Sequence, residues 1–186
     1  MIGDAIWYEA AQVVGITNAL NVAADGLGAL GPVDDSSAPA ETRALFAEIR
    51  DFYGGGAEVP LAFRFIAHDP AYATDVWAAA RHAYADNRLT RRFKEALAFA
   101  VSVTTRSASG AALHLAELRR LGVGQPGVME IVGVTQMFSS YTKIADTLQL
   151  EPDMGHIAAV DPTPAPGGTA ATPRGPAPPA RSPEAP

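Results

Sequence analysis

Apolar residues recur at intervals of three and four from residue 6 to about residue 150. This spacing places them on one side of successive helices. No stretch alternates apolar and polar residues as a half-buried strand does. Glycine and proline clusters, such as Gly31-Pro32 and residues 54–56, divide the pattern into segments of helical length. The sequence therefore predicts an all-α fold for residues 4–155.

The stretch from Lys94 to Val123 predicts two helices joined at a polar break, around which the other helices pack. Glu95 lies near the start of the first helix, and a lone histidine, His114, lies in the second. A carboxylate buried without a partner is costly. We therefore expect Glu95 to bond to His114, directly or through water. The neighbouring Glu117, Arg119 and Arg120 are expected on a solvated face.

The remaining helices are predicted from apolar spacing and end signals. Thr90 is expected to cap the helix that contains Glu95, because a threonine oxygen can accept from free amides at a helix start. The expected segments are residues 6–28, 40–53, a short helix after Pro60, 71–86, and a last helix from Pro126 to about Leu150.

The chain divides into three predicted regions. Residues 1–40 form an N-terminal helix and loop, and residues 41–155 form the main helical domain. Residues 156–186 form a disordered tail, because this proline- and alanine-rich segment has too little apolar area to offset its ordering entropy. The sequence 14–17 resembles 132–135, so the N-terminal helix is either the remnant of a repeated module or a coincidence of composition.

Composition excludes several classes of function. The formal net charge of −6 argues against nucleic acid as a general partner. The absence of cysteine excludes disulfides, thiolate metal sites and thiol chemistry. No histidine or acid pair has metal-ligand spacing, and no apolar run reaches membrane-helix length. The first residues lack a basic n-region, so we expect a cytoplasmic protein that does not bind membranes.

Residues 41–152 resemble the alkylhydroperoxidase-D-like and carboxymuconolactone decarboxylase superfamily. The resemblance rests on a series of short motifs in a fixed order. The last of them is an apolar helix that begins near Glu95 and is followed by His114, 19 residues after this glutamate. The motifs are Tyr53-Gly54, Val59-Pro60, His68-Asp69-Pro70, Leu89-Thr90-Arg91-Arg92, Lys94-Glu95 and His114. The resemblance implies a helical domain that forms a homo-oligomer, with sites near subunit interfaces. We expect no metal and no organic cofactor.

The chain differs from the peroxidase branch of this superfamily at the positions of the redox-active residues. Ser107 and Gly110 stand at the positions of the two redox cysteines. A serine hydroxyl cannot cycle through sulfenic acid and disulfide, and glycine has no side chain to do so. Thiol peroxidase activity is therefore not expected. Ser107 is interpreted mainly as a helix cap. His114 is seven residues further on, roughly 10 Å along a helix, too far to activate it as a nucleophile.

Two hypotheses for the function remain open. In the first, the chain is a decarboxylase- or isomerase-type enzyme on a small organic acid. Glu95 and His114 are then the acid–base pair, and Ser107 is a hydrogen-bond donor. In the second, the chain is a non-catalytic oligomeric binding or scaffold protein with a degenerate site. A polar, open cavity beside His114 favours the enzyme, and a filled apolar one favours the scaffold.

Overall fold

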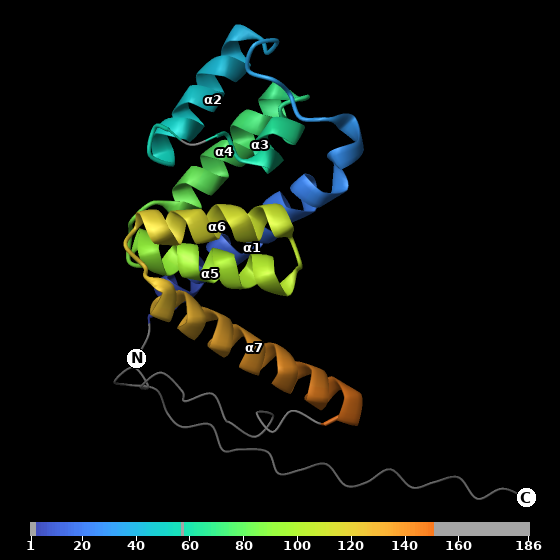
Figure 1. The fold of residues 1–186 in the computed structure, drawn as a ribbon, viewed down its shortest axis with the longest axis vertical. Coiled ribbons are helices and arrows are strands. Elements are labelled where there is room, and N and C mark those ends of the chain that lie inside the picture. Colours follow the sequence, from blue (N-terminus) through green and yellow to red (C-terminus); the bar gives the residue numbers. More distant parts are fainter. Residues whose placement is uncertain (1–2, 57, 151–186) are drawn as a thin grey trace, which may run out of the picture. The chain divides into compact units, whose positions relative to one another are not determined.

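A computed structural model of the protein describes residues 3–56 and 58–150. These residues form seven α-helices and one 3-10 turn, and no strand occurs among them, which confirms the all-α prediction (Figure 1). The predicted tail, 156–186, lies outside the described residues. The elements are α1 (Asp4–Gly26), η1 (Gly28–Leu30), α2 (Ala40–Phe52), α3 (Leu61–Ile66), α4 (Pro70–Tyr84), α5 (Arg91–Thr104), α6 (Ala108–Arg120) and α7 (Gln125–Leu148).

Short polar residues define the ends of α5 and α6. The Thr90 hydroxyl accepts from the Phe93 N–H at 3.3 Å, as predicted. At the other end of α5, Arg106 adopts a left-handed φ of 61°. The N–H of Ser107 then donates to the Ser102 carbonyl at 3.0 Å, and the N–H of Arg106 to the Val103 carbonyl at 3.2 Å. This Schellman closure turns the chain directly into α6, so α5 and α6 lie side by side (Figure 1).

Helix α1 is an integral part of the core. It contacts α3, α4, α5 and α6, and it lies in the same compact unit as they do. Its buried face includes Val13, Thr17 and Leu20. The Thr17 hydroxyl lies 2.7 Å from the Tyr84 hydroxyl of α4, which joins the two helices by a buried hydrogen bond. The possibility that α1 is the remnant of a repeated module related to α7 stays a prediction.

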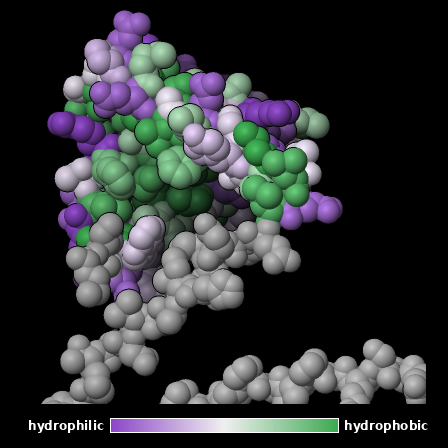
Figure 2. Space-filling view, turned by 90° about the horizontal axis from the view of Figure 1, so that it is seen from below, coloured by the Kyte–Doolittle hydropathy of each residue, from purple (hydrophilic) through white to green (hydrophobic). Residues whose placement is uncertain are grey.

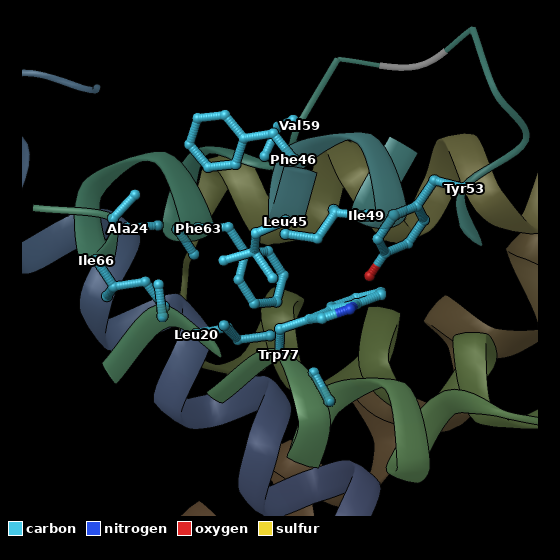
Figure 3. Close-up of a cluster of buried hydrophobic side chains, with 14 of the residues drawn as sticks. Leu20, Ala24, Leu45, Phe46, Ile49, Tyr53, Val59, Phe63, Ile66 and Trp77 are labelled. Carbon is cyan, nitrogen blue, oxygen red and sulfur yellow. The ribbon is translucent and has the colours of Figure 1, made fainter. Parts of the chain in front are cut away.

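The hydrophobic core is built around the indole of Trp77 (Figure 3). The rings of Phe52 and Phe63 meet this indole edge to face, with centroids 5.2 and 5.4 Å away. The guanidinium carbon of Arg91 lies 3.9 Å from the centroid of the Phe52 ring. This cation–π contact joins the apolar core to the charged groups of the candidate site.

Helix α7 differs from the others because none of its residues is buried, although it contacts α5. Its half-buried residues include Val128, Ile131 and Thr135, which mark the side that packs on α5. Of the apolar residues that the sequence spacing assigns to one side of this helix, Ile131 and Ala145 are half-buried. The larger ones that follow Ile131 are exposed: Val134, Phe138, Tyr141, Ile144 and Leu148. No helix within the described part of the chain is long and apolar enough to cross a membrane.

Candidate functional site

The predicted contact between Glu95 and His114 is present. Glu95 Oε2 lies 2.7 Å from His114 Nδ1, and the two residues come from the adjacent helices α5 and α6. Glu95 is fully buried and His114 is 2% exposed. The bond is therefore direct, and it supplies the partner that a buried carboxylate requires.

Arg91 completes a buried network behind this pair. It lies one turn before Glu95, and its Nε donates to Glu95 Oε1 at 2.8 Å. Its Nη2 donates to Glu117 Oε2 at 3.0 Å. Glu117, which is 4% exposed, also accepts from Arg120 at 2.7 Å. The prediction that Glu117 lies on a solvated face was wrong, because its carboxylate points inward to neutralise Arg91.

This network fixes the hydrogen-bonding role of each ring nitrogen of His114. Both Glu95 oxygens accept hydrogen bonds, one from Arg91 and one from Nδ1, and a carboxylate has no proton to donate. Nδ1 therefore carries the proton of the neutral ring, and Nε2 holds the free lone pair. Nε2 has no hydrogen-bond partner among the described residues.

His114 lines a cavity of about 60 Å³ between α1, α3 and α6. Most of the wall is apolar, including Leu20, Phe63 and Leu113. Its polar side chains are those of Asn21, Ser109 and His114 itself. The cavity is thus neither the open polar pocket expected of the enzyme nor a completely filled core. It is a small space whose wall includes a histidine side chain.

Two buried tyrosines adjoin the network but do not act as acids. Burial raises the pKa of Tyr53, and the nearby Tyr84 and Glu95 raise it further. Burial also raises the pKa of Tyr84, whose ring centroid lies 5.7 Å from that of His114. Both phenols therefore stay protonated at physiological pH.

Ser107 occupies a structural position at the start of α6. Its hydroxyl accepts from the Gly110 N–H at 3.3 Å and donates to Asp25 Oδ1 of α1 at 3.2 Å. It is 1% exposed and is not among the residues that line the cavity. The structure thus brings Glu95 and His114 together but places Ser107 apart from them, as the cap of α6.

A second buried ion pair lies at the other end of α5. Lys94 is fully buried, and its Nζ lies 2.6 Å from Glu9 Oε1 of α1. Burial opposes ionisation of Glu9, but Lys94 and the amides of Leu89 and Arg88 outweigh it together and lower the pKa of Glu9. Because this pKa is depressed on folding, the pair stabilises the fold above the ordinary glutamate pKa, and its contribution fades as the pH falls below it.

The other histidines of the described region do not join the site. His68 Nε2 lies 3.0 Å from the Gly31 carbonyl, and His82 is exposed. Among residues 3–56 and 58–150, no three histidines or acids are placed to hold a metal ion.

Comparison with known families supports the resemblance seen in the sequence. Residues 70–150 match the model of the Carboxymuconolactone decarboxylase family. No curated protein and no solved structure gave a match. The matched segment contains Arg91, Glu95, His114 and Glu117, whereas Asn21 and Phe63 of the cavity wall lie outside it. Residues 70–150 are thus similar to the carboxymuconolactone decarboxylase family, and the chain lacks the cysteine pair.

Proposed function

We propose that the protein is an acid–base enzyme that decarboxylates or isomerises a small organic acid, with His114 as the proton-transfer group. The observation that carries this proposal is the bond between Glu95 and Nδ1, which leaves Nε2 as the free basic atom of a residue that lines the cavity. Histidine is suited to this task because its ordinary pKa of about 6.5 lies near physiological pH.

The proposed chemistry needs only one mobile proton. In an isomerisation, Nε2 removes a proton from a carbon beside an activating carbonyl, so a C–H bond breaks and an N–H bond forms. The Glu95 carboxylate stabilises the imidazolium, and the same proton returns to a different carbon. No electrons are gained or lost, so the step calls for no redox cofactor. A thiol peroxidase cycle is not available to a chain without cysteine.

Hydrogen–deuterium exchange tests this proposal without knowledge of the physiological reaction. In D₂O, the full-length protein should accelerate exchange of carbon-bound protons in at least one member of a panel of small oxo and unsaturated acids. His114→Gln should slow this exchange by about 100-fold or more. Glu95→Gln should slow it by roughly 10- to 100-fold, because the ring loses its anionic partner.

The matched control is His82→Gln, which changes an exposed histidine of α4 and should leave the exchange rate unchanged. Proton NMR measures the exchange directly. If the wild-type protein accelerates none of the panel, or if His114→Gln exchanges at the wild-type rate, His114 is not the catalytic base.

A second candidate function, assembly of a homo-oligomer as a binding scaffold, is favoured by α7. Five large apolar side chains follow one another at intervals of three and four residues, the spacing of a coiled-coil seam. Each is more than half exposed, from 52% to 63%, and apolar side chains gather on the face shown in Figure 2. The seam residues are Val134, Met137, Tyr141, Ile144 and Leu148.

We propose that α7 of a second copy covers this seam. When the seam of one copy packs against the same seam of a second copy, the contact has two-fold symmetry. This is the commonest symmetry of homo-oligomers. Tyr141→Glu should therefore lower the molar mass measured by light scattering after size-exclusion chromatography. The control, Gln136→Glu, places the same charge at an exposed position outside the seam and should not change the mass. A wild-type monomer at micromolar concentration would rule out this assembly.

A further inference from the structure

The space at position 110 is filled by a side chain from another helix. A Cβ atom at Gly110 would lie 2.1 Å from Asn21 Oδ1 and 2.7 Å from Ser102 Oγ, far inside van der Waals contact. Asn21 belongs to α1 and is 4% exposed. The amide of Asn21 therefore takes the place that any side chain at position 110 would occupy, directly beside the cavity that both residues line.

Hydrogen bonds fix the orientation of this amide. Asn21 Nδ2 donates to Ser102 Oγ at 3.2 Å and to Thr105 Oγ1 at 3.0 Å. The Thr105 hydroxyl already donates its proton to the Val101 carbonyl at 2.9 Å, so it must accept from Asn21. Both amide protons are thus used. Oδ1 remains an acceptor, with only a long contact of 3.4 Å from the Ser102 hydroxyl.

Among the residues that line the cavity, Asn21 Oδ1 and His114 Nε2 are therefore the candidate acceptors for a ligand. No lysine or arginine is among the residues that line it. The buried cations nearby are already paired, Arg91 with Glu95 and Glu117, and Lys94 with Glu9. A further carboxylate, Asp25, holds the Ser107 hydroxyl at the start of α6. A ligand carboxylate would enter this space without a free cation to pair with, which is unfavourable in a buried site.

Size limits the ligand as well. A cavity of about 60 Å³ is well below the roughly 150 Å³ of an apolar cavity that binds benzene. It has room for about two water molecules, or for one end of a small molecule. A ring-sized acid cannot enter whole.

We propose that this cavity binds the neutral, hydroxyl-bearing end of a small molecule, with Asn21 as the residue that determines this specificity. A hydroxyl proton is donated to Asn21 Oδ1, and the apolar wall holds the adjoining carbon atoms, one of which faces His114 Nε2. Any carboxylate of the substrate stays outside the cavity. The inference rests on the proposed role of His114 and defines which end of the substrate reaches it.

The test uses 1,2-propanediol and propionate, two probes with equal numbers of non-hydrogen atoms. The full-length protein, labelled with ¹⁵N in its histidines, is titrated with each at pH 8, above the ordinary imidazole pKa. The diol should shift the His114 ring resonances with a dissociation constant on the order of millimolar, as expected for so small a ligand. Propionate should bind at least tenfold more weakly.

Variants of Asn21 link the preference to this residue. Asn21→Ala should remove the preference for the diol, and Asn21→Asp, which keeps an oxygen and adds charge, should weaken propionate binding further. Asn18→Ala, at an exposed position on α1, should behave as the wild type. Propionate binding as tightly as the diol overturns the inference but leaves His114 as a ligand-facing base. If neither probe shifts His114, both the inference and the proposed function are wrong.

Discussion

Replacing Arg91 by methionine should lower the free energy of unfolding by about 3–5 kcal/mol, because it leaves two buried carboxylates without their shared cation. Arg91 bonds to Glu95 at 2.8 Å and to Glu117 at 3.0 Å, and both acids are at most 4% exposed. Methionine keeps most of the apolar stem and removes the guanidinium, so the loss reports the charge, with its contact on Phe52, rather than the volume. Equilibrium denaturation in urea measures it.

Arg92→Met is the matched control for this substitution. Arg92 is the next residue of the same helix and is exposed. Its replacement should change the free energy of unfolding by less than about 0.5 kcal/mol. Equal effects of the two substitutions would show that Arg91 does not hold the buried acids in place.

Gly110→Ala should destabilise the protein by about 1–3 kcal/mol, the usual range for overpacking a filled core. The added Cβ would meet Asn21 Oδ1 at 2.1 Å, and the amide can move only by giving up its bonds to Ser102 and Thr105. In an Asn21→Ala background the contact with Oδ1 is gone and only the Ser102 hydroxyl, at 2.7 Å, still has to move, so the same substitution should cost less. This coupling is measured by a double-mutant cycle.

Gly15→Ala is the control for helix propensity. Gly15 lies within α1, and a Cβ there meets no atom within 4 Å. Alanine at this position should stabilise the protein by roughly 0.5–1 kcal/mol. If Gly110→Ala stabilises it similarly, the side chain of Asn21 does not fill the space at position 110.

Local signals in the sequence were sufficient to predict the helices and the central contact. Thr90 and Ser107 are caps because short hydroxyl side chains satisfy free amides wherever a helix starts, which is a property of nearby residues alone. The bond between Glu95 and His114 followed from the cost of an unpaired buried acid. The same rule could not be applied to Glu117, because the sequence did not indicate that this side chain is buried.

The ion pairs of Arg91 with Glu95 and Glu117 were harder to predict, because the choice of partner depends on tertiary structure. Arg91 lies four residues before Glu95, a spacing that places both on one helix face, and this signal was available. Glu117 lies among arginines, a pattern typical of a solvated surface. Its burial depends on how α6 packs against α5, which helical spacing alone does not specify.

The role of α1 in the site also depends on long-range packing. Asn21 and Gly110 are far apart in the sequence, and nothing near Gly110 indicates which side chain fills its space. The predicted region 1–40 contains Glu9 and Asn21, which pair with or contact residues of α5 and α6. For α7, the spacing predicted an apolar side but not Met137, and only the fold shows that most of the large apolar side chains of this helix are exposed.

The tautomer of His114 tests the central claim most directly, since the proposed chemistry requires a free lone pair on Nε2. The ¹⁵N chemical shifts of the ring, measured above the pH at which it becomes neutral, distinguish the two nitrogens. We predict that Nδ1 resonates as a protonated nitrogen and Nε2 as an unprotonated one, and that Glu95→Gln weakens this preference. A protonated Nε2 in the neutral ring of the wild-type protein would contradict the account.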